Sequence, residues 1–181
     1  MDKYSILKAF YNWNPAIVRS MEDCKHFYYE EGQLVSTNPY HLENSVFTHT
    51  ILVYKEALKK LSLLTTEEEK VSLQIIALCH DIGKVYTRKQ DTETQKVSMN
   101  GHGESSVQDT IDFLTFLENN GYFMGLDYHQ IYYNVLSVIS NHMRYVKCKD
   151  YRSALRDCNE RLDVLSKVFN LIDTEGSLLD E

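Results

Sequence analysis

Apolar residues recur at helical spacing along most of the chain, and little interrupts them. Segment 103–118 is typical, with apolar residues at intervals of four, three and three: Val107, Ile111, Leu114 and Leu117. The chain has only two prolines, Pro15 and Pro39, and both lie in its first quarter. Because proline breaks a helix interior, the other three quarters are free to form long helices. The pattern predicts an all-α fold.

Helices are predicted over segments 3–11, 15–24, 45–63, 66–79, 103–118, 127–143 and about 158–173. Ser45 is placed to cap the third of these, and Thr66 with Glu69 forms the T-x-x-E capping box of the fourth. Segments 28–43 and 84–101 are polar and are predicted to be loops. The first has room for a short extended piece, and the second for a small hairpin.

Length and composition limit the class of protein. With 181 residues, of which 43% are hydrophobic and 25% charged, the chain is expected to form one domain over residues 1–181 with a substantial core. It has no apolar run of the ~18 residues that a membrane helix needs. The N-terminal segment lacks the pattern of a signal peptide. We therefore expect a cytoplasmic protein without a membrane partner.

Net charge and cysteine content limit the classes of binding partner, metal site and cellular compartment to be expected. The net charge is −7, whereas a protein that grips long nucleic acid through many phosphates is usually basic. This net charge is compatible with a short phosphorylated substrate or with the end of an RNA. The four cysteines form no C-x-x-C pair, so we do not expect a cysteine zinc site. They also give no reason to expect disulfides, which is typical of a reducing compartment.

Imidazoles and carboxylates gather at the ends of the predicted helices. These residues are His49 in a first turn, His80 and Asp81 at an end, His102 at a start, and His142 and Asp173 at two further ends. In a bundle, such ends can converge on one pocket. Imidazole and carboxylate bind Zn, Fe, Mn, Co and Ni, whereas Mg favours oxygen. Six ligands are more than one tetrahedral site needs, so the pattern predicts two divalent ions that share a carboxylate. The alternative is a structural His–Asp pair at a helix end that binds no metal.

The signature residues also carry a family resemblance. In order and context, His49, the pair His80–Asp81 and Asp173 resemble the H…HD…D signature of the HD superfamily of metal-dependent phosphohydrolases, over about residues 42–176. The stretches FTHTILVYKEAL, ALCHDIGK, NGHGESS and DTEG are similar to HD modules of bacterial tRNA CCA-adding enzymes and of RNA end-healing kinases. The resemblance implies an all-α bundle in which the four signature residues bind the first ion. It also implies that His102 and His142 bind a second ion and that Asp81 bridges the two.

The reaction expected from this resemblance is hydrolysis of a phosphate ester by metal-bound hydroxide, with Asp81 at its centre. Lys84 and Arg144 are candidate cations for the substrate phosphate, with an ordinary surface role as the alternative for each. Either His41 or Glu43 is a candidate to support a ligand imidazole. His26 and His129 are interpreted as structural.

Three hypotheses for the substrate and function are compatible with the sequence. The first hypothesis is a phosphodiesterase or phosphatase for 2′,3′-cyclic, 2′- or 3′-phosphate ends of nucleotides or RNA, with RNA-repair enzymes as possible partners. The second is a nucleotidase or (d)NTP triphosphohydrolase, a group that tends to carry a glutamate soon after HD, whereas Ile, Gly, Lys and Val follow Asp81 here. The third is a regulatory module that holds metal without catalysis.

Overall fold

The computed structural model describes residues 4–147 and 160–177, apart from the side chains of 144–147, 160 and 161. The helices are α1 (Ser5–Trp13), α2 (Pro15–Asp23), α3 (Val46–Lys60), α4 (Glu67–Cys79), α5 (Lys84–Thr87), α6 (His102–Ser105), α7 (Val107–Asn119), α8 (Tyr128–Lys147) and α10 (Glu160–Gly176), with a 3-10 turn at Leu61–Leu63. The strands are β1 (Tyr28–Glu30), β2 (Gln33–Ser36), β3 (Lys89–Asp91) and β4 (Lys96–Ser98). The prediction of a helical bundle is confirmed.

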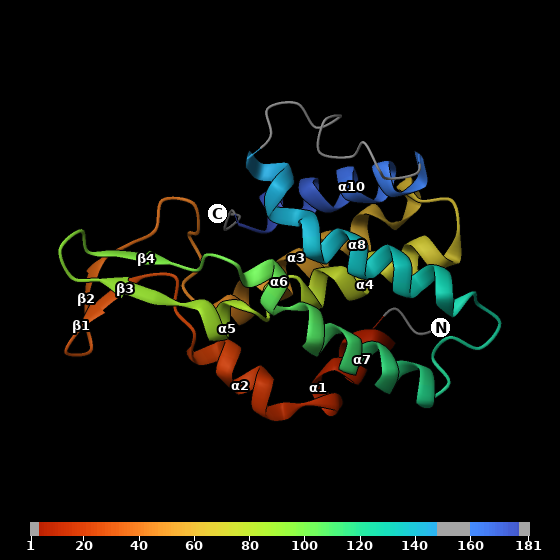
Figure 1. Cartoon of the computed structure of the whole chain (residues 1–181), viewed down its shortest axis with the longest axis horizontal. Helices are drawn as coiled ribbons and strands as arrows, with labels where there is room; N and C mark the ends of the chain where they lie inside the picture. Colours follow the sequence, from red (N-terminus) through yellow and green to blue (C-terminus); the bar gives the residue numbers. More distant parts are fainter. Residues whose placement is uncertain (1–3, 148–159, 178–181) are drawn as a thin grey trace.

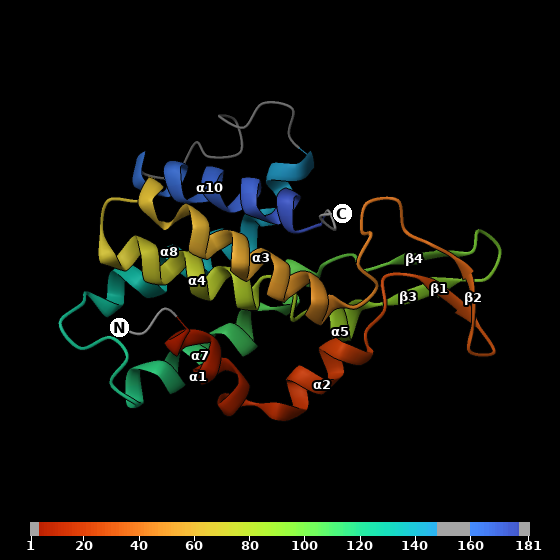
Figure 2. The same ribbon diagram turned by 180° about the vertical axis from the view of Figure 1, so that it is seen from behind.

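Helix α4 lies in the centre of the bundle. It packs against α3, α8 and α10, while α1, α2 and α7 lie below it in Figure 1 and again in the reverse view of Figure 2. The run from Ile75 to Cys79 has no exposed surface. A helix that is apolar on all sides is a buried helix. Its C-terminal end, where His80 and Asp81 follow, is therefore inside the molecule.

Two short antiparallel hairpins, β1–β2 and β3–β4, lie together at one end of the bundle (Figure 1). The Gln90 side chain joins them, since it accepts from the Tyr29 N–H at 3.3 Å and donates to the Tyr29 carbonyl at 2.9 Å. Glu31 and Gly32 turn the first hairpin with φ of 48° and 80°, as a two-residue hairpin turn requires. Each of the two segments predicted to be loops thus contains a hairpin, and the helical turn α5 precedes the hairpin β3–β4.

Both predicted helix caps are confirmed. The Ser45 hydroxyl accepts the Thr48 N–H at 3.0 Å, and Thr66 and Glu69 form the full capping box. Most of the other helix boundaries differ from the predicted ones by one to three residues, and two differences are larger. Segment 103–118 is divided at Ser106 into α6 and α7. Helix α8 continues to Lys147, so the placement of His142 at a helix end was wrong, because nothing in the following MRYVK stops a helix.

Within the described residues, no helix has the length and apolar character needed to cross a membrane.

Candidate metal centre

Five helices bring the six predicted ligands together. His49 lies in the first turn of α3, His80 caps the end of α4, and Asp81 follows it. His102 begins α6, His142 lies within α8, and Asp173 lies in the last turn of α10. The four imidazoles and Asp81 are nearly inaccessible, with at most 4% of each residue exposed. Such burial of polar groups requires partners.

The first group of ligand atoms comes from α3, α4 and α10. His49 Nε2 and His80 Nε2 lie 3.0 and 3.3 Å from Asp173 Oδ1, and 3.4 Å from each other. Asp81 Oδ2 lies 3.5 Å from His49 Nε2 and 3.3 Å from His80 Nε2. One oxygen of each carboxylate therefore lies within 3.5 Å of both imidazole nitrogens.

The second group adjoins the first through Asp81. Its other oxygen, Oδ1, lies 3.2 Å from His102 Nε2, which lies 3.0 Å from His142 Nε2. Asp81 thus offers one oxygen to each group.

The opposite ring nitrogens identify the tautomers. Three Nδ1 atoms face backbone carbonyls: His80 faces Ala77 at 3.2 Å, His102 faces Met99 at 2.7 Å and His142 faces Ile139 at 2.6 Å. His49 Nδ1 lies 3.1 Å from the Glu43 carboxylate. Of the two residues expected to support a ligand imidazole, His41 and Glu43, it is therefore Glu43 that lies behind the ring of His49. Nitrogens that face acceptors carry a proton, so Nε2 is the atom of each ring that can bind a metal. Such a donor set fits divalent cations.

A close backbone approach holds the two groups in register. A Cβ on Gly83 would lie 2.1 Å from the His102 carbonyl oxygen and 2.7 Å from the Ser106 nitrogen. The buried Ser106 hydroxyl accepts the Gly83 N–H at 2.8 Å and lies 2.9 Å from the His80 carbonyl oxygen. Only glycine lets the chain after Asp81 pack this closely on α6.

Charge inside the centre is unevenly distributed. Burial alone would lower the pKa of His80, but the carboxylates of Asp81 and Asp173 outweigh it and raise the pKa to about 10. For His142, burial and the neighbouring His80 lower the pKa to about 4. Without metal at neutral pH, His80 is therefore protonated and His142 is neutral.

Ion binding to the first group is expected to release protons. Because the pKa of His80 is about 10 in the metal-free site, at least one proton must leave at pH 7 before Nε2 can bind a metal. Affinity for Mn²⁺ should therefore rise with pH across the neutral range and fall as the pH is lowered. Calorimetric titration in two buffers of different ionisation enthalpy measures this release. Equal binding enthalpies in the two buffers would contradict it.

A cavity of about 710 Å³ opens beside the ligands. Asp81, His102, His142 and Asp173 lie in its wall, as does Lys84. Polar and aromatic residues complete the lining, among them Asn38, Tyr40, Asn100 and Thr174. The cavity therefore reaches residues of both ligand groups, and its volume is in the range of small-molecule sites.

The structure shows the position of one of the two predicted substrate-contact residues, and the contacts themselves stay predictions. Lys84 is buried and lines the cavity, with Nζ 2.7 Å from Asp81 Oδ2, so it lies beside the ligands and not on an ordinary surface. The Arg144 side chain lies outside the described residues. Arg144 therefore stays a prediction.

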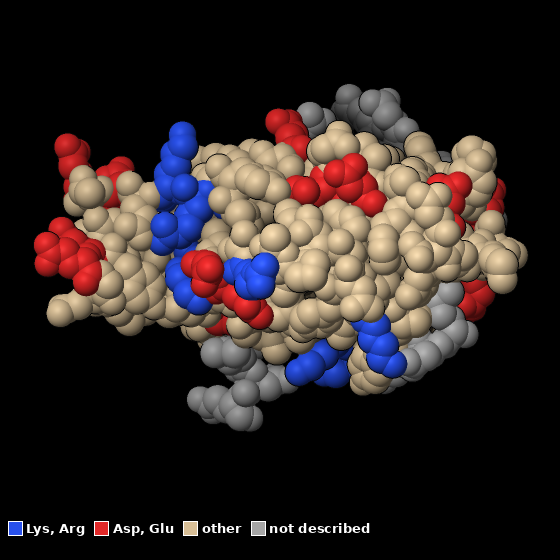
Figure 3. All heavy atoms as spheres, turned by 90° about the horizontal axis from the view of Figure 1, so that it is seen from below, with Lys and Arg blue, Asp and Glu red and all other residues tan. Residues whose placement is uncertain are grey.

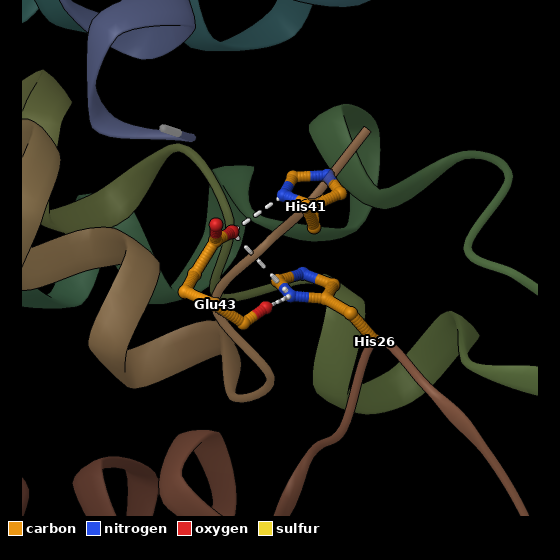
Figure 4. A group of neighbouring side chains, drawn as sticks. All are labelled: His26, His41 and Glu43. Carbon is orange, nitrogen blue, oxygen red and sulfur yellow. Dashed lines mark hydrogen bonds and ion pairs between the residues drawn. The ribbon is translucent and has the colours of Figure 1, made fainter. Parts of the chain in front are cut away.

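His26, His41 and Glu43 form a third cluster at the cavity wall (Figure 4). His41 Nδ1 lies 2.6 Å from Glu43 Oε1, and the rings of His26 and His41 stack 3.9 Å apart with 11° between their planes. Imidazole lone pairs lie in the ring plane, so two stacked rings cannot both direct them to one ion. Although its three side chains are of metal-binding types, we interpret this cluster as a support for the centre because its rings are stacked.

The fold and the centre define a helical bundle with a buried histidine–aspartate site for metal. Residues 46–173 match the family model described as "HD domain", which covers most of the chain. The chain therefore belongs to the HD domain family of metal-dependent phosphohydrolases. No curated protein and no solved structure gives a significant match.

Proposed function

We propose that the chain hydrolyses phosphate esters of nucleotides or of RNA ends at a centre of two divalent ions. The observation that carries the proposal is Asp81, which offers one oxygen to each of two ligand groups. His49, His80 and Asp173 would complete the first ion's ligands, and His102 and His142 the second's. Two such ions supply an activated water and neutralise charge on the phosphate oxygens.

Lys84 contributes to the proposed reaction directly. Its ammonium lies at the cavity wall beside Asp81, where it can approach a non-bridging phosphate oxygen. A cation fixed in a water-poor site stabilises the charge that develops there in the transition state. Glu43 holds the His49 imidazole from behind and so helps fix the first ligand group.

Cavity size and surface charge support a small substrate. A cavity of about 710 Å³ is in the range of small-molecule sites. On the face shown in Figure 3, Lys and Arg side chains form separate groups with acidic side chains between them, and the net charge is −7. These features favour a nucleotide or an RNA end over long nucleic acid.

Within this class we favour 2′,3′-cyclic, 2′- or 3′-phosphate ends. The support is the similarity of ALCHDIGK and NGHGESS to HD modules of RNA-processing enzymes, together with the lack of an acid just after Asp81. On this proposal the protein acts in the cytoplasm beside RNA-repair enzymes.

The test is a substrate panel with the Mn²⁺-reconstituted protein. Hydrolysis of bis-p-nitrophenyl phosphate that is lost in Asp81→Ala would support a phosphohydrolase, and preference for 2′,3′-cyclic AMP or 3′-AMP over dAMP and dATP would support the substrate class. Cleavage of dATP or dAMP alone would establish the nucleotidase or triphosphohydrolase alternative. Equal rates in native protein and variant would leave only a regulatory metal module.

A further inference from the structure

Lys84 is held on two sides. Only 6% of the residue is exposed, and its Nζ lies 2.7 Å from Asp81 Oδ2 and 3.2 Å from His26 Nε2. A buried ammonium needs partners for its protons, because an unpaired buried charge is strongly destabilising. His26 provides a partner that is not itself charged. It therefore fixes the position of the Lys84 ammonium without bringing a further negative charge to the site.

The surroundings of His26 identify which ring nitrogen accepts. Its Nδ1 lies 3.3 Å from the Glu43 backbone carbonyl, which can only accept a hydrogen bond. The proton therefore lies on Nδ1, and the Nε2 lone pair faces Lys84. Burial, with the charge of Lys84, lowers the pKa of His26 to about 2, which agrees with a neutral ring.

The segment that carries His26 is itself fixed. The His26 N–H donates to the Asn44 carbonyl at 2.7 Å, and the Val46 N–H to the Cys24 carbonyl at 3.0 Å. From the other side, the Arg88 guanidinium donates to the carbonyls of Lys25 and Phe27 at 2.6 and 3.0 Å. The His26 ring also stacks on His41, as Figure 4 shows. The ring therefore has little freedom to move.

We propose that His26 is a positioning residue, whose ring holds the Lys84 ammonium at the cavity wall in line with the substrate phosphate. The inference rests on the proposed function, in which Lys84 contacts that phosphate. His26 lies before residues 46–173, which match the HD family. The segment that precedes the family's part of the chain thus completes the site. His26 acts through Lys84, whose ammonium it contacts at 3.2 Å.

Two variants test this proposal. His26→Gln can place a side-chain oxygen near the position of Nε2, whereas His26→Leu keeps an apolar side chain of similar size and removes the acceptor. His129→Leu, at an exposed histidine of α8, is the control. Each protein is reconstituted with Mn²⁺ and assayed for kcat and KM on bis-p-nitrophenyl phosphate. Metal content, thermal unfolding and acetylation of Lys84 by acetic anhydride, followed by mass spectrometry, are measured on the same samples.

We expect His26→Leu to bind the same number of ions and to lose about tenfold to 100-fold in kcat, as for a misplaced catalytic group. His26→Gln should regain most of this loss, and His129→Leu should match the native protein. Acetylation of Lys84 should rise severalfold in His26→Leu. In a Lys84→Met background, His26→Leu should have no further effect on kcat, because the two residues act as one unit.

Several results would overturn the proposal. Native kcat in His26→Leu would do so, as would a full additional loss in the Lys84→Met background. Loss of an ion from His26→Leu would make His26 a ligand instead. If the native chain cleaves no phosphate ester, the proposed function fails with the catalytic consequence, but acetylation still tests the contact: equal labelling of Lys84 in native protein and His26→Leu would disprove it.

Discussion

Asp81→Asn should reduce phosphate ester hydrolysis by at least about 10³-fold, as loss of a central electrostatic group does. The amide keeps the shape of the carboxylate, but its nitrogen cannot bind a cation. Since Oδ1 faces His102 and Oδ2 faces His49 and His80, either orientation deprives one ligand group of its shared oxygen. Initial rates on bis-p-nitrophenyl phosphate measure the loss.

Asp112→Asn is the matched control for this change. Asp112 is exposed on α7 and accepts a hydrogen bond only from Gln108 among the contacts described for it, at 3.0 Å. This variant should keep native rates and native metal content. An Asp81→Asn protein with the rate of Asp112→Asn would show that the carboxylate has no part in the reaction.

Gly83→Ala should lower the free energy of unfolding by at least about 2 kcal/mol, in the range of overpacked cores. The added methyl would meet the His102 carbonyl oxygen at 2.1 Å, and that backbone atom cannot rotate away as a side chain can. The usual gain of alanine over glycine through unfolded-state entropy, about 0.4–1 kcal/mol, is too small to offset this. Urea unfolding of the metal-free protein measures the change.

The same substitution should weaken the second ligand group. Moving α6 away from Gly83 carries His102 away from Asp81 Oδ1, so Gly83→Ala should bind Mn²⁺ at the second site more weakly than the native protein does. Glu104→Ala, at an exposed position of the same helix, should stay within about 0.5 kcal/mol of native stability. Equal stability of the two variants would mean that the close packing at Gly83 is not required.

Much of the fold was predictable because it depends on local rules. The caps at Ser45 and Thr66 use side chains three residues from their partners, and the helical faces follow a fixed period. The first hairpin was harder to predict, because its turn places Glu31 at positive φ, where Asn or Asp is the usual signal. The end of α8 was mispredicted since a functional residue, His142, was used as a boundary.

The site was predictable only as a set of ligand types. The order of His49, His80, Asp81 and Asp173 indicated which residues meet, through a resemblance that the family match supports at the level of the HD domain. The role of Gly83 depends on how near α6 comes, which no spacing reveals. The same holds for His26, whose contact with Lys84 joins residues 58 positions apart.

We propose that Asp81 joins two ions in one catalytic centre. The decisive measurement is elemental analysis of the Mn²⁺-reconstituted native chain beside His102→Ala. We predict about two ions per chain for the native protein and about one for the variant, since His102 serves only the second group. One ion in both proteins would contradict the shared centre and leave His102 and His142 without a metal, and no ion in either would return His80 and Asp81 to an ordinary pair at a helix end.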